Sequence, residues 1–521
     1  MIQYQKFERR WVIAYATIVM ILLVVPFLIG FSSQTTEQHF SGGIIGIEDT
    51  NSYLAKMNQG AHGAWMFTLP YSSEPQHGAP LYWFYLLLGK ISGAGFLNRV
   101  IVFQLARTFF GFLLILIVYR FLAEFLPRVN QRRLALIIVT LGGGLGWLLI
   151  LFGNMNWFNS LPLEFYSPES FSFLMLLTLP HLLAARCLFI LALLTFLHRR
   201  YVWSGLTLIF LSLIQPAEVI IVWAIIGLFS VINLIVVEKS ISRNALWKNL
   251  YPTFLTTMIS APLLMYIGYL FLSDPILNQW SVQNVLPSPH PLHYISGYGP
   301  YLILATFGFK PLKQINPALW RFTMAWTLLI PVLIYMPIGL QRRLIEGFQV
   351  PLVTLTILGL STINYSYRRW LTILLLSLIF PSSLMLFTGA IQSASHTTEP
   401  VFLPADELVV FDWLNQNAQP GEVVLSSYRT GNAVPVYTPL VSFFGHTVET
   451  VFYDKKLTQV VAFYQPETNN NERLGLISAG RIAYIFFGPQ ERKLGALDPS
   501  SLPYLKKRFE YGDYAIYQVI P

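Results

Sequence analysis

The sequence has one cysteine, Cys187, among 521 residues, and this cysteine lies within an apolar segment. A single thiol excludes an intramolecular disulfide and any motif that needs two cysteines. The chain also lacks the glycine-rich P-loop, the H-E-x-x-H zinc motif and the G-x-S-x-G nucleophile motif. These absences argue against a P-loop ATPase, a zinc protease and an α/β-hydrolase.

Charged side chains are also scarce. They make up 11% of the residues, against about 25% in a typical soluble domain, whereas 54% of the residues are hydrophobic. Apolar runs recur from the start of the chain to about residue 390, and runs of roughly 20 residues are long enough to cross a hydrocarbon core of about 30 Å. The composition therefore predicts a polytopic membrane protein.

The net charge of +9 comes from short clusters of Lys and Arg between the apolar runs. This is the pattern of cytoplasmic loops, and it does not favour a nucleic-acid partner. Lys6, Arg9 and Arg10 precede the first run, at residues 11–31, which is longer than the apolar part of a signal peptide. We therefore expect an uncleaved first span, a cytoplasmic N-terminus and a location in the cell membrane.

Residues 1–395 are predicted to form a mainly α-helical transmembrane bundle of about 11 spans. The short apolar run at residues 80–91 leaves two topologies open. If it is interfacial or re-entrant, Arg128, Arg132 and Arg133 are cytoplasmic. If it crosses the membrane, these arginines lie outside.

From residue 400 the charge density rises and the apolar runs shorten to strand length. Residues 400–521 are therefore predicted to be a soluble α/β domain. We expect helices at residues 405–417, 455–464 and 471–479, and strands at residues 423–426, 434–437, 482–487 and 514–520. An odd number of spans would place this domain outside the cytoplasm.

The polar insert at residues 32–80 separates two apolar segments and contains four acidic residues but only one basic residue, Lys56. This balance predicts an outside loop. Its adjacent acids Glu48 and Asp49, with Glu164 and Glu169 of a later outside loop, could act as general bases or bind Mg²⁺ or Mn²⁺. Ordinary solvated loop charges remain the alternative interpretation.

Aromatic side chains in and after the insert, such as Trp65, offer flat apolar faces that suit sugar rings or the membrane interface. Arg107, His181 and Arg186 lie inside apolar runs, where an ionisable side chain is costly and commonly functional. The two arginines could bind a phosphate group. Alternatively, they pair with an acid such as Glu218, and His181 is an ordinary core histidine. His446, alone in the C-terminal part, is predicted to be structural.

Several stretches together resemble the GT-C superfamily of integral-membrane glycosyltransferases, and in particular a bacterial branch of it. They are Glu48-Asp49-Thr50 with Tyr53-Leu54-Ala55-Lys56-Met57, Gly63-Ala64-Trp65, Pro70-Tyr71, Gly144-Leu145-Gly146-Trp147, Pro180-His181, Gln341-Arg342-Arg343 and Gly445-His446-Thr447. The resemblance extends over nearly the whole chain. It implies that a sugar moves from a polyprenyl-phosphate donor to an acceptor hydroxyl, with inversion, at the outer membrane face.

By this resemblance Asp49 is the preferred catalytic base, with Glu48 as the other candidate. Arg342 or Arg343 would bind the donor phosphate, and Glu164 and Glu169 would supply a second acid. A divalent cation held by Asp49, Glu164 and Glu169 is an open possibility, although the chain has no tight DxD triplet. The remaining substrate-binding candidates are Tyr53, Lys56, Trp65, His77, Arg107, His181 and Arg186.

The resemblance leaves the sugar, the polyprenol and the acceptor open, and the acceptor could be a glycan, a lipid or a protein. Two other functions also remain. A transporter or flippase of a lipid-linked saccharide would use the same intramembrane arginines. A non-catalytic membrane scaffold would keep the fold and bind a partner through its C-terminal domain. Fold analogy alone does not separate these functions.

Overall fold

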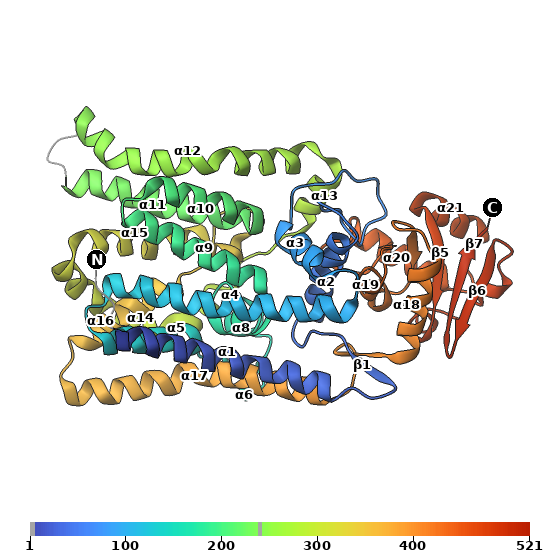
Figure 1. The fold of residues 1–521 in the computed structure, drawn as a ribbon, viewed down its shortest axis with the longest axis horizontal. Coiled ribbons are helices and arrows are strands. Elements are labelled where there is room, and N and C mark those ends of the chain that lie inside the picture. The colour runs from blue at the N-terminus through green and yellow to red at the C-terminus, as the bar shows by residue number, and fades with distance from the viewer. Residues whose placement is uncertain (1–5, 238–241, 521) are drawn as a thin grey trace. The chain divides into compact units, whose positions relative to one another are not determined.

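The computed structural model describes residues 6–237 and 242–520 (Figure 1). It divides into two compact units, each built from three separate stretches of chain. The first comprises residues 1–25, 105–267 and 285–390, and the second comprises residues 26–104, 268–284 and 391–521. The insert at residues 32–80 thus belongs to the same unit as the C-terminal residues. A domain boundary between residues 395 and 400 was predicted on the basis of composition, and that boundary stays a prediction.

Within the described ranges, eight helical segments are long and apolar enough to cross a membrane. They are Phe7–Ser32 (in α1, Lys6–Ser32), Phe96–Phe125 (α4), Val129–Leu151 (α5 and α6), Pro180–Leu197 (α9), Pro216–Val237 (α11), Arg243–Ser273 (α12), Gln341–Ser361 (η1, Gln341–Ile345, and α16, Gln349–Ser361) and Tyr365–Ser395 (α17). The chain is an integral, multi-pass membrane protein, and the predicted mainly helical fold is confirmed.

Eight segments are fewer than the predicted count of about 11. The other three predicted spans correspond to α10 (Tyr201–Ile214), α14 (Pro291–Ile315) and α15 (Pro317–Leu333). Helices α10 and α15 are apolar but have only 14 and 17 residues. Helix α14 has 25 residues, but two lysines and several polar side chains lower its hydropathy. Runs of apolar residues in the sequence therefore do not all become full-length apolar helices.

Two predicted spans are each interrupted in the structure. Residues 134–152 contain the end of α5 (Val129–Leu141) and α6 (Gly146–Leu151), and residues 173–197 contain most of α8 (Ser172–Thr178) and α9. The first break contains Gly144, where an added Cβ would lie 2.5 Å from the Cα of Gly297 in α14. Only a residue without a side chain permits so close an approach of the two backbones. The short helix α7 (Leu163–Tyr166) lies between the two pairs.

The ambiguous apolar run at residues 80–91 forms α3, Trp83–Ser92, of only 10 residues. At a rise of 1.5 Å per residue, a helix of this length extends about 15 Å, roughly half of the hydrocarbon core. The structure therefore favours the topology in which this run does not cross the membrane. The cytoplasmic position of Arg128, Arg132 and Arg133 stays a prediction.

The polar insert contains a helix of its own, α2, Ile47–Ala61, which starts after Gly46 in the left-handed conformation (φ 62°). Helices α2 and α3 touch through backbone at two glycines. A Cβ on Gly60 would lie 2.1 Å from the carbonyl oxygen of Leu86, and a Cβ on Gly89 would lie 1.9 Å from that of Met57. The same unit contains β1 (Gln38–Phe40), which pairs antiparallel with β2 (Phe402–Pro404), and α13 (Pro275–Gln283).

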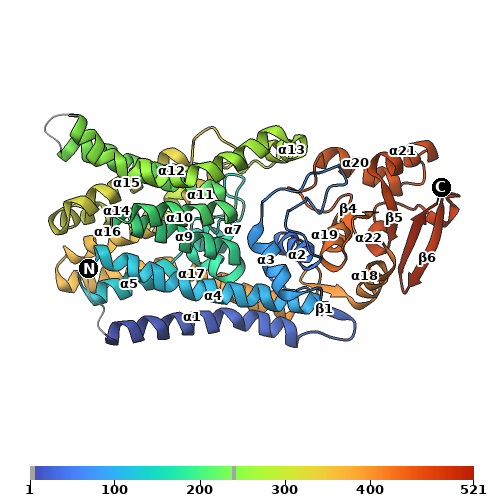
Figure 2. The same ribbon diagram turned by 45° about the horizontal axis from the view of Figure 1, so that its top comes forward.

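The C-terminal residues form a five-stranded mixed sheet in the order β4-β3-β5-β7-β6. The strands are β3 (Val423–Leu425), β4 (Val441–Ser442), β5 (Ile482–Phe487), β6 (Leu505–Tyr511) and β7 (Tyr514–Val519). Helices α20 (Tyr453–Tyr464) and α21 (Asn470–Gly480) pack on one face, and α18 (Ala405–Asn417) and α19 (Tyr428–Tyr437) on the other (Figure 2). Two short elements, α22 (Pro489–Arg492) and η2 (Pro499–Ser501), complete this part. The predicted α/β fold is confirmed.

One predicted strand is wrong: residues 434–437 form the last turn of α19. The β-branched sequence Val-Pro-Val-Tyr favours a strand locally. Tertiary contacts override this preference, because Ser427 caps the helix by accepting from the Thr430 N–H, and Asn58 of α2 binds the carbonyl groups of Pro435 and Thr438. Strand β6 was not predicted, since its sequence Leu-Lys-Lys-Arg-Phe-Glu-Tyr is mostly charged.

Candidate active site

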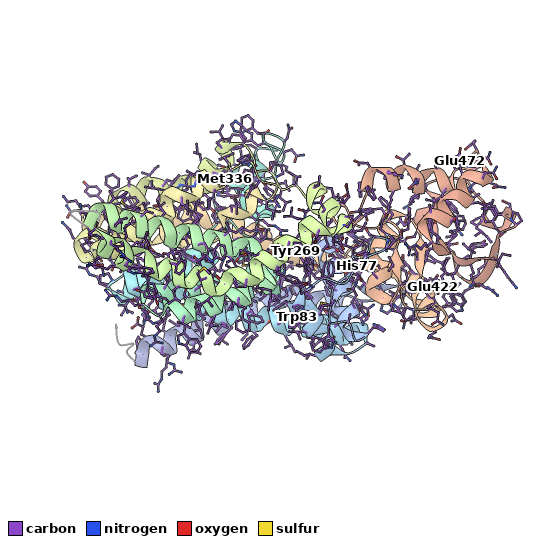
Figure 3. The ribbon with its side chains drawn as sticks, turned by 90° about the horizontal axis from the view of Figure 1, so that it is seen from above. His77, Trp83, Tyr269, Met336, Glu422 and Glu472 are labelled. Carbon is purple, nitrogen blue, oxygen red and sulfur yellow. The ribbon has the colours of Figure 1, made fainter. Side chains whose placement is uncertain are left out.

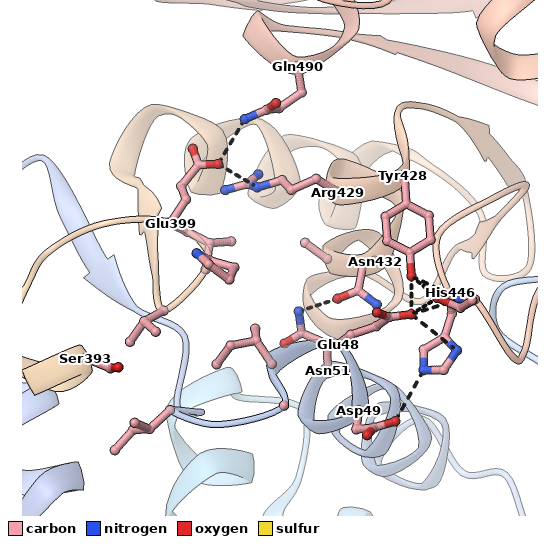
Figure 4. A pocket seen from close by; sticks show the side chains of 18 of the residues that line it. Glu48, Asp49, Asn51, Ser393, Glu399, Tyr428, Arg429, Asn432, His446 and Gln490 are labelled. Carbon is pink, nitrogen blue, oxygen red and sulfur yellow. Dashed lines mark hydrogen bonds and ion pairs between the residues drawn. The ribbon is translucent and has the colours of Figure 1, made fainter. Parts of the chain in front are cut away.

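The second unit contains a cavity of about 930 Å³ at the N-terminal end of α2 (Figure 4). Polar and charged side chains from two parts of the chain line it. From the insert come Glu48, Asp49 and Asn51, and from the C-terminal residues come Ser393, Glu399, Tyr428, Arg429, Asn432, His446, Thr447 and Gln490. The predicted acid pair therefore faces a space large enough for a small ligand.

Glu48 and Asp49 occupy the first turn of α2. Free N–H groups at a helix N-terminus favour negative charge, so this position favours ionised carboxylates. The two side chains differ in exposure, because 63% of the Asp49 side chain is accessible and 37% of Glu48. Asp49 is therefore the more accessible of the two acids.

Glu48 is held by neighbours from the C-terminal part of the chain. Its Oε1 atom accepts hydrogen bonds from the backbone N–H of Thr447 at 2.8 Å and from the Thr447 hydroxyl at 2.7 Å. The hydroxyl of Tyr428 also donates to it. Three donors on one carboxylate oxygen fix Glu48 in place and reduce its availability to a ligand.

His446 lies beside Asp49, with its Nε2 atom 3.8 Å from Asp49 Oδ1. Its Nδ1 atom accepts from the backbone N–H groups of Val448 and Glu449 at 3.1 and 3.2 Å. In the neutral ring the proton therefore resides on Nε2, the atom that faces Asp49. The ring also packs against Tyr71, with 5.3 Å between centroids.

Burial lowers the pKa of His446, but the surrounding carboxylates together raise it by a larger amount. Asp49, Glu449 and Glu48 together raise the pKa of His446 above its ordinary value. His446 and Asp49 thus form an acid–imidazole pair at the wall of the cavity. The Nε2–H of His446 and the carboxylate of Asp49 face each other as donor and acceptor.

Behind this wall is a buried ion pair that links α2 to the loop after β4. Lys56 Nζ lies 2.6 Å from Glu449 Oε1, and the hydroxyl of Ser52 donates to the same oxygen at 2.6 Å. Burial lowers the pKa of Lys56. Burial also disfavours charge on Glu449, but Lys56 and His446 hold the pKa of Glu449 below its ordinary value. Lys56, a predicted substrate-binding residue, is fully buried and does not line the cavity.

The opposite wall of the cavity contains Arg429 from α19. Its Nε atom lies 3.1 Å from Glu399 Oε2, and its Nη1 atom binds the buried carboxylate of Glu407. Gln490 donates to Glu399 at 2.9 Å, as Figure 4 shows. Polar donors and acceptors therefore surround the cavity on both sides.

The other predicted residues of the insert are not among those that line the cavity. Tyr53 stacks on Tyr85, with 4.6 Å between ring centroids. Trp65 is exposed, and the Nζ atom of Lys90 lies 4.1 Å from its ring centroid. His77 is exposed in the segment before α3 (Figure 3). Their substrate-binding roles stay predictions.

The predicted basic residues of the apolar runs belong to the first unit. Arg107, in α4, is buried and donates to the carbonyl groups of Leu176 at 2.9 Å and Leu23 at 3.2 Å. Arg186, in α9, forms a buried ion pair with Glu346 and donates to the carbonyl group of Glu169. The alternative interpretation paired Arg186 with an acid such as Glu218. The acid that forms the ion pair is Glu346.

The remaining predicted site residues also lie in the first unit. Glu164 is buried and accepts from the Gly146 N–H at 2.6 Å and from the Ser382 hydroxyl at 3.0 Å. Glu169 lies 3.7 Å from Arg343 Nε, and the guanidinium group of Arg342 lies over the ring of Tyr166. His181 is buried in the first turn of α9.

The predicted metal ligands come from both units. Glu164 and Glu169 share the first unit, whereas Asp49 belongs to the second. Within residues 6–237 and 242–520, no three His, Cys, Asp or Glu side chains are placed to hold a metal ion. The metal-binding role of Asp49, Glu164 and Glu169 stays a prediction.

Several residues of the site were not predicted, because they lie about 400 positions from Asp49 in the sequence. These are Tyr428, Arg429 and Glu449, and His446 was predicted to be structural only. One signal was present, since Gly445-His446-Thr447 is among the stretches that carry the family resemblance. Only the packing of α19 against α2 brings these side chains to the acid pair.

No protein-family profile matches the chain, and no curated protein matches it by sequence. Solved structures do match it by fold. One is the oligosaccharyltransferase of Archaeoglobus fulgidus, at 13% identity and a TM-score of 0.55, covering 98% of this chain and 75% of the other. A second structure of that enzyme, with an inhibitory peptide and a dolichol-phosphate, has a TM-score of 0.52 at the same identity and coverage.

The mycobacterial arabinofuranosyltransferase AftD is also similar, with 12% identity and a TM-score of 0.56. The match covers 98% of this chain but only 40% of AftD. At such identities the similarity concerns the fold, and it extends over nearly the entire chain. The fold is that of the GT-C glycosyltransferases, which confirms the resemblance found in the sequence.

Proposed function

We propose that the protein is an inverting glycosyltransferase that moves a sugar from a polyprenyl-phosphate donor to an acceptor hydroxyl at the outer membrane face. The observation that carries the proposal is the accessible carboxylate of Asp49, which lines a polar cavity beside His446. The fold adds support, because lipid-phosphate-dependent glycosyltransferases have a similar fold.

In the proposed reaction the acceptor hydroxyl gives its proton to Asp49 while its oxygen forms a bond to C1 of the sugar. The bond between C1 and the phosphate oxygen breaks, and its electron pair leaves with the polyprenyl phosphate. Asp49 suits this role because it is ionised by preference at the N-terminus of α2 and is open to the cavity. His446 would stabilise the position of the carboxylate through its Nε2–H, which faces Asp49.

Glu48 is a weaker candidate for the base, because three hydrogen bonds occupy its Oε1 atom. We assign to it the role of fixing the first turn of α2 against Thr447 and Tyr428. Arg342 and Arg343 remain our proposed donors to the phosphate, since a guanidinium group binds phosphate oxygens in pairs. The sugar, the polyprenol and the chemical class of the acceptor stay open.

The test uses the full-length protein in liposomes, tritiated pentosyl- and hexosyl-phosphate polyprenols as donors, and membranes from a strain without the gene as acceptors. Asp49→Asn should lower sugar transfer by about 100-fold or more, the typical contribution of a general base. Donor retention by the variant should stay unchanged. Asp454→Asn is a matched control, because Asp454 is an exposed acid in the first turn of α20.

Three outcomes would contradict parts of the proposal. Full transfer by both Asp49→Asn and Glu48→Gln would show that neither acid is the base. Movement of the labelled lipid across the bilayer without transfer to any acceptor would identify a transporter. Absence of both transfer and transport, with a bound protein partner, would favour the scaffold function.

A further inference from the structure

A second cavity, of about 590 Å³, lies in the first unit between α5, α16 and α17. It is separate in sequence and composition from the cavity at Asp49. Three arginines line it, Arg128, Arg368 and Arg369, together with polar side chains from the same helices. The polar set is Asn130, Gln131, Ser361, Tyr365 and Thr372.

The positive charge of this cavity is not balanced locally. No Asp or Glu occurs at residues 126–135 or 355–375. Among the residues that the structure describes, Arg128, Arg368 and Arg369 form no ion pair, whereas nearby Arg132 is neutralised by Glu8 at 2.7 Å. Arginines clustered at the ends of membrane helices attract anions.

The backbone adds to this preference for an anion. Helix α5 begins at Val129, directly after Arg128, and α17 begins at Tyr365, three residues before Arg368. Residues from the first turns of both helices line the cavity. The N–H groups at helix N-termini favour negative charge, and phosphate groups bind readily there.

Part of the cavity lining is apolar and includes Leu134, Ile357, Leu360 and Ile373. These residues lie on α5, α16 and α17, helices that form candidate membrane spans. A lining that combines arginines with apolar side chains of membrane-spanning helices suits an anionic lipid, whose phosphate is polar and whose chains are not.

We propose that this cavity is a binding site for the phosphate headgroup of an anionic phospholipid. The arginines would donate to the phosphate oxygens, and the apolar residues would contact the start of the acyl chains. The site does not depend on the proposed sugar transfer, since it uses none of the residues assigned to that reaction. The same chemistry would also accept a free phosphate, so the experiment includes both sources.

The test uses the purified full-length protein in a neutral detergent. Native mass spectrometry counts bound dioleoylphosphatidylglycerol, with dioleoylphosphatidylcholine as the lipid that lacks net charge. A parallel titration uses inorganic phosphate and follows the melting temperature. Arg368→Gln with Arg369→Gln removes two charges near the membrane surface, so phosphatidylglycerol should bind about tenfold or more weakly.

Two further variants make the test specific. Arg199→Gln with Arg200→Gln removes an exposed arginine pair at the turn before α10 and should leave lipid binding unchanged. Arg368→Lys with Arg369→Lys keeps the charge and should retain most of the binding, which separates loss of charge from loss of folding. Melting temperatures in phosphatidylcholine should be similar for all variants.

The outcomes decide between lipid and free phosphate. If the Arg368→Gln, Arg369→Gln variant binds phosphatidylglycerol more weakly but is stabilised by phosphate as the wild type is, the result supports a lipid site. If the variant loses lipid binding and phosphate-induced stabilisation to the same extent, the result supports a site for the phosphate group in general. Equal binding of phosphatidylglycerol and phosphate by the wild type and the Arg368→Gln, Arg369→Gln variant would overturn the proposal. An equal loss in the Arg199→Gln, Arg200→Gln control would do the same, because it would indicate nonspecific attraction.

Discussion

The Nε2 atom of His446 lies 3.8 Å from the Oδ1 atom of Asp49, although the two residues are 397 positions apart in the sequence. The backbone N–H groups of Val448 and Glu449 donate to the other ring nitrogen and so orient the imidazole toward Asp49. This pair connects the N-terminal turn of α2 to the loop after β4. We take it as the basis of the first prediction.

His446→Ala should lower sugar transfer by about tenfold, a change of about 1.4 kcal/mol in the activation free energy. The reason is that Asp49 would lose the neighbouring N–H group that orients its carboxylate. The KM for the lipid donor should stay within error, since His446 does not bind the donor in our proposal. His396→Ala is the control, because His396 is exposed and is not among the residues that line the cavity. Wild-type rates for His446→Ala would remove His446 from the mechanism.

Glu449→Gln should destabilise the second unit by about 3 kcal/mol, because it leaves the ammonium group of Lys56 buried without its counter-charge. Lys56→Met combined with Glu449→Gln should recover part of this loss, since the buried charge is then absent. Thermal unfolding of the purified variants, followed by circular dichroism, measures both effects. Equal stability of the single and double variants would show that the ion pair does not couple the two residues.

Glu407 makes the stability of the second unit depend on pH. Burial raises the pKa of Glu407 to about 7, although the positive charge of Arg429 lowers it in part. Its pKa is thus higher in the folded than in the unfolded state. Its contribution to stability is therefore fully present below about pH 4.5 and is lost as the pH rises through 7.

Between pH 5 and pH 8 the wild type should lose several degrees of melting temperature relative to Glu407→Gln, which cannot ionise. At pH 5 the two proteins should melt at similar temperatures, because Glu407 is then mostly protonated and as uncharged as a glutamine side chain. The comparison is made by melting both proteins across this range in one detergent. Parallel curves would mean that Glu407 does not titrate there.

Gly431 is expected to be intolerant of any side chain. A Cβ at this position would lie 1.9 Å from the carbonyl oxygen of Phe444, just before His446. Gly431→Ala should therefore displace the His446 loop, lower the melting temperature by several degrees and reduce transfer. Gly475→Ala in α21 is the matched control, since a Cβ there meets no atom within 4 Å. It should be neutral or slightly stabilising.

The sequence by itself determined much of the architecture. The long apolar runs identified the membrane helices, because a span needs about 20 apolar residues and little else. Alternating short runs after residue 400 predicted the α/β part, including α18 at residues 405–417 and β5 at residues 482–487. Glu48 and Asp49 were recognisable as candidates because two acids stand together in an insert with only one basic residue.

Other features needed tertiary contacts. Residues 434–437 have strand propensity but form a helix, because Asn58 and Arg99 bind the carbonyl groups of this segment. Lys56 has the sequence environment of a loop residue, yet it is buried against Glu449. The difference between Glu48 and Asp49 also depends on distant donors, Thr447 and Tyr428, which occupy one acid and leave the other accessible.

Local sequence thus specified which segments are apolar, helical or acidic, because those properties depend on composition and spacing within one segment. The identity of the accessible acid was decided only by the fold, because His446, Thr447 and Tyr428 reach α2 through packing between segments almost 400 residues apart. Burial, hydrogen bonding and the pKa of each side chain follow from those contacts, which no single segment of sequence contains.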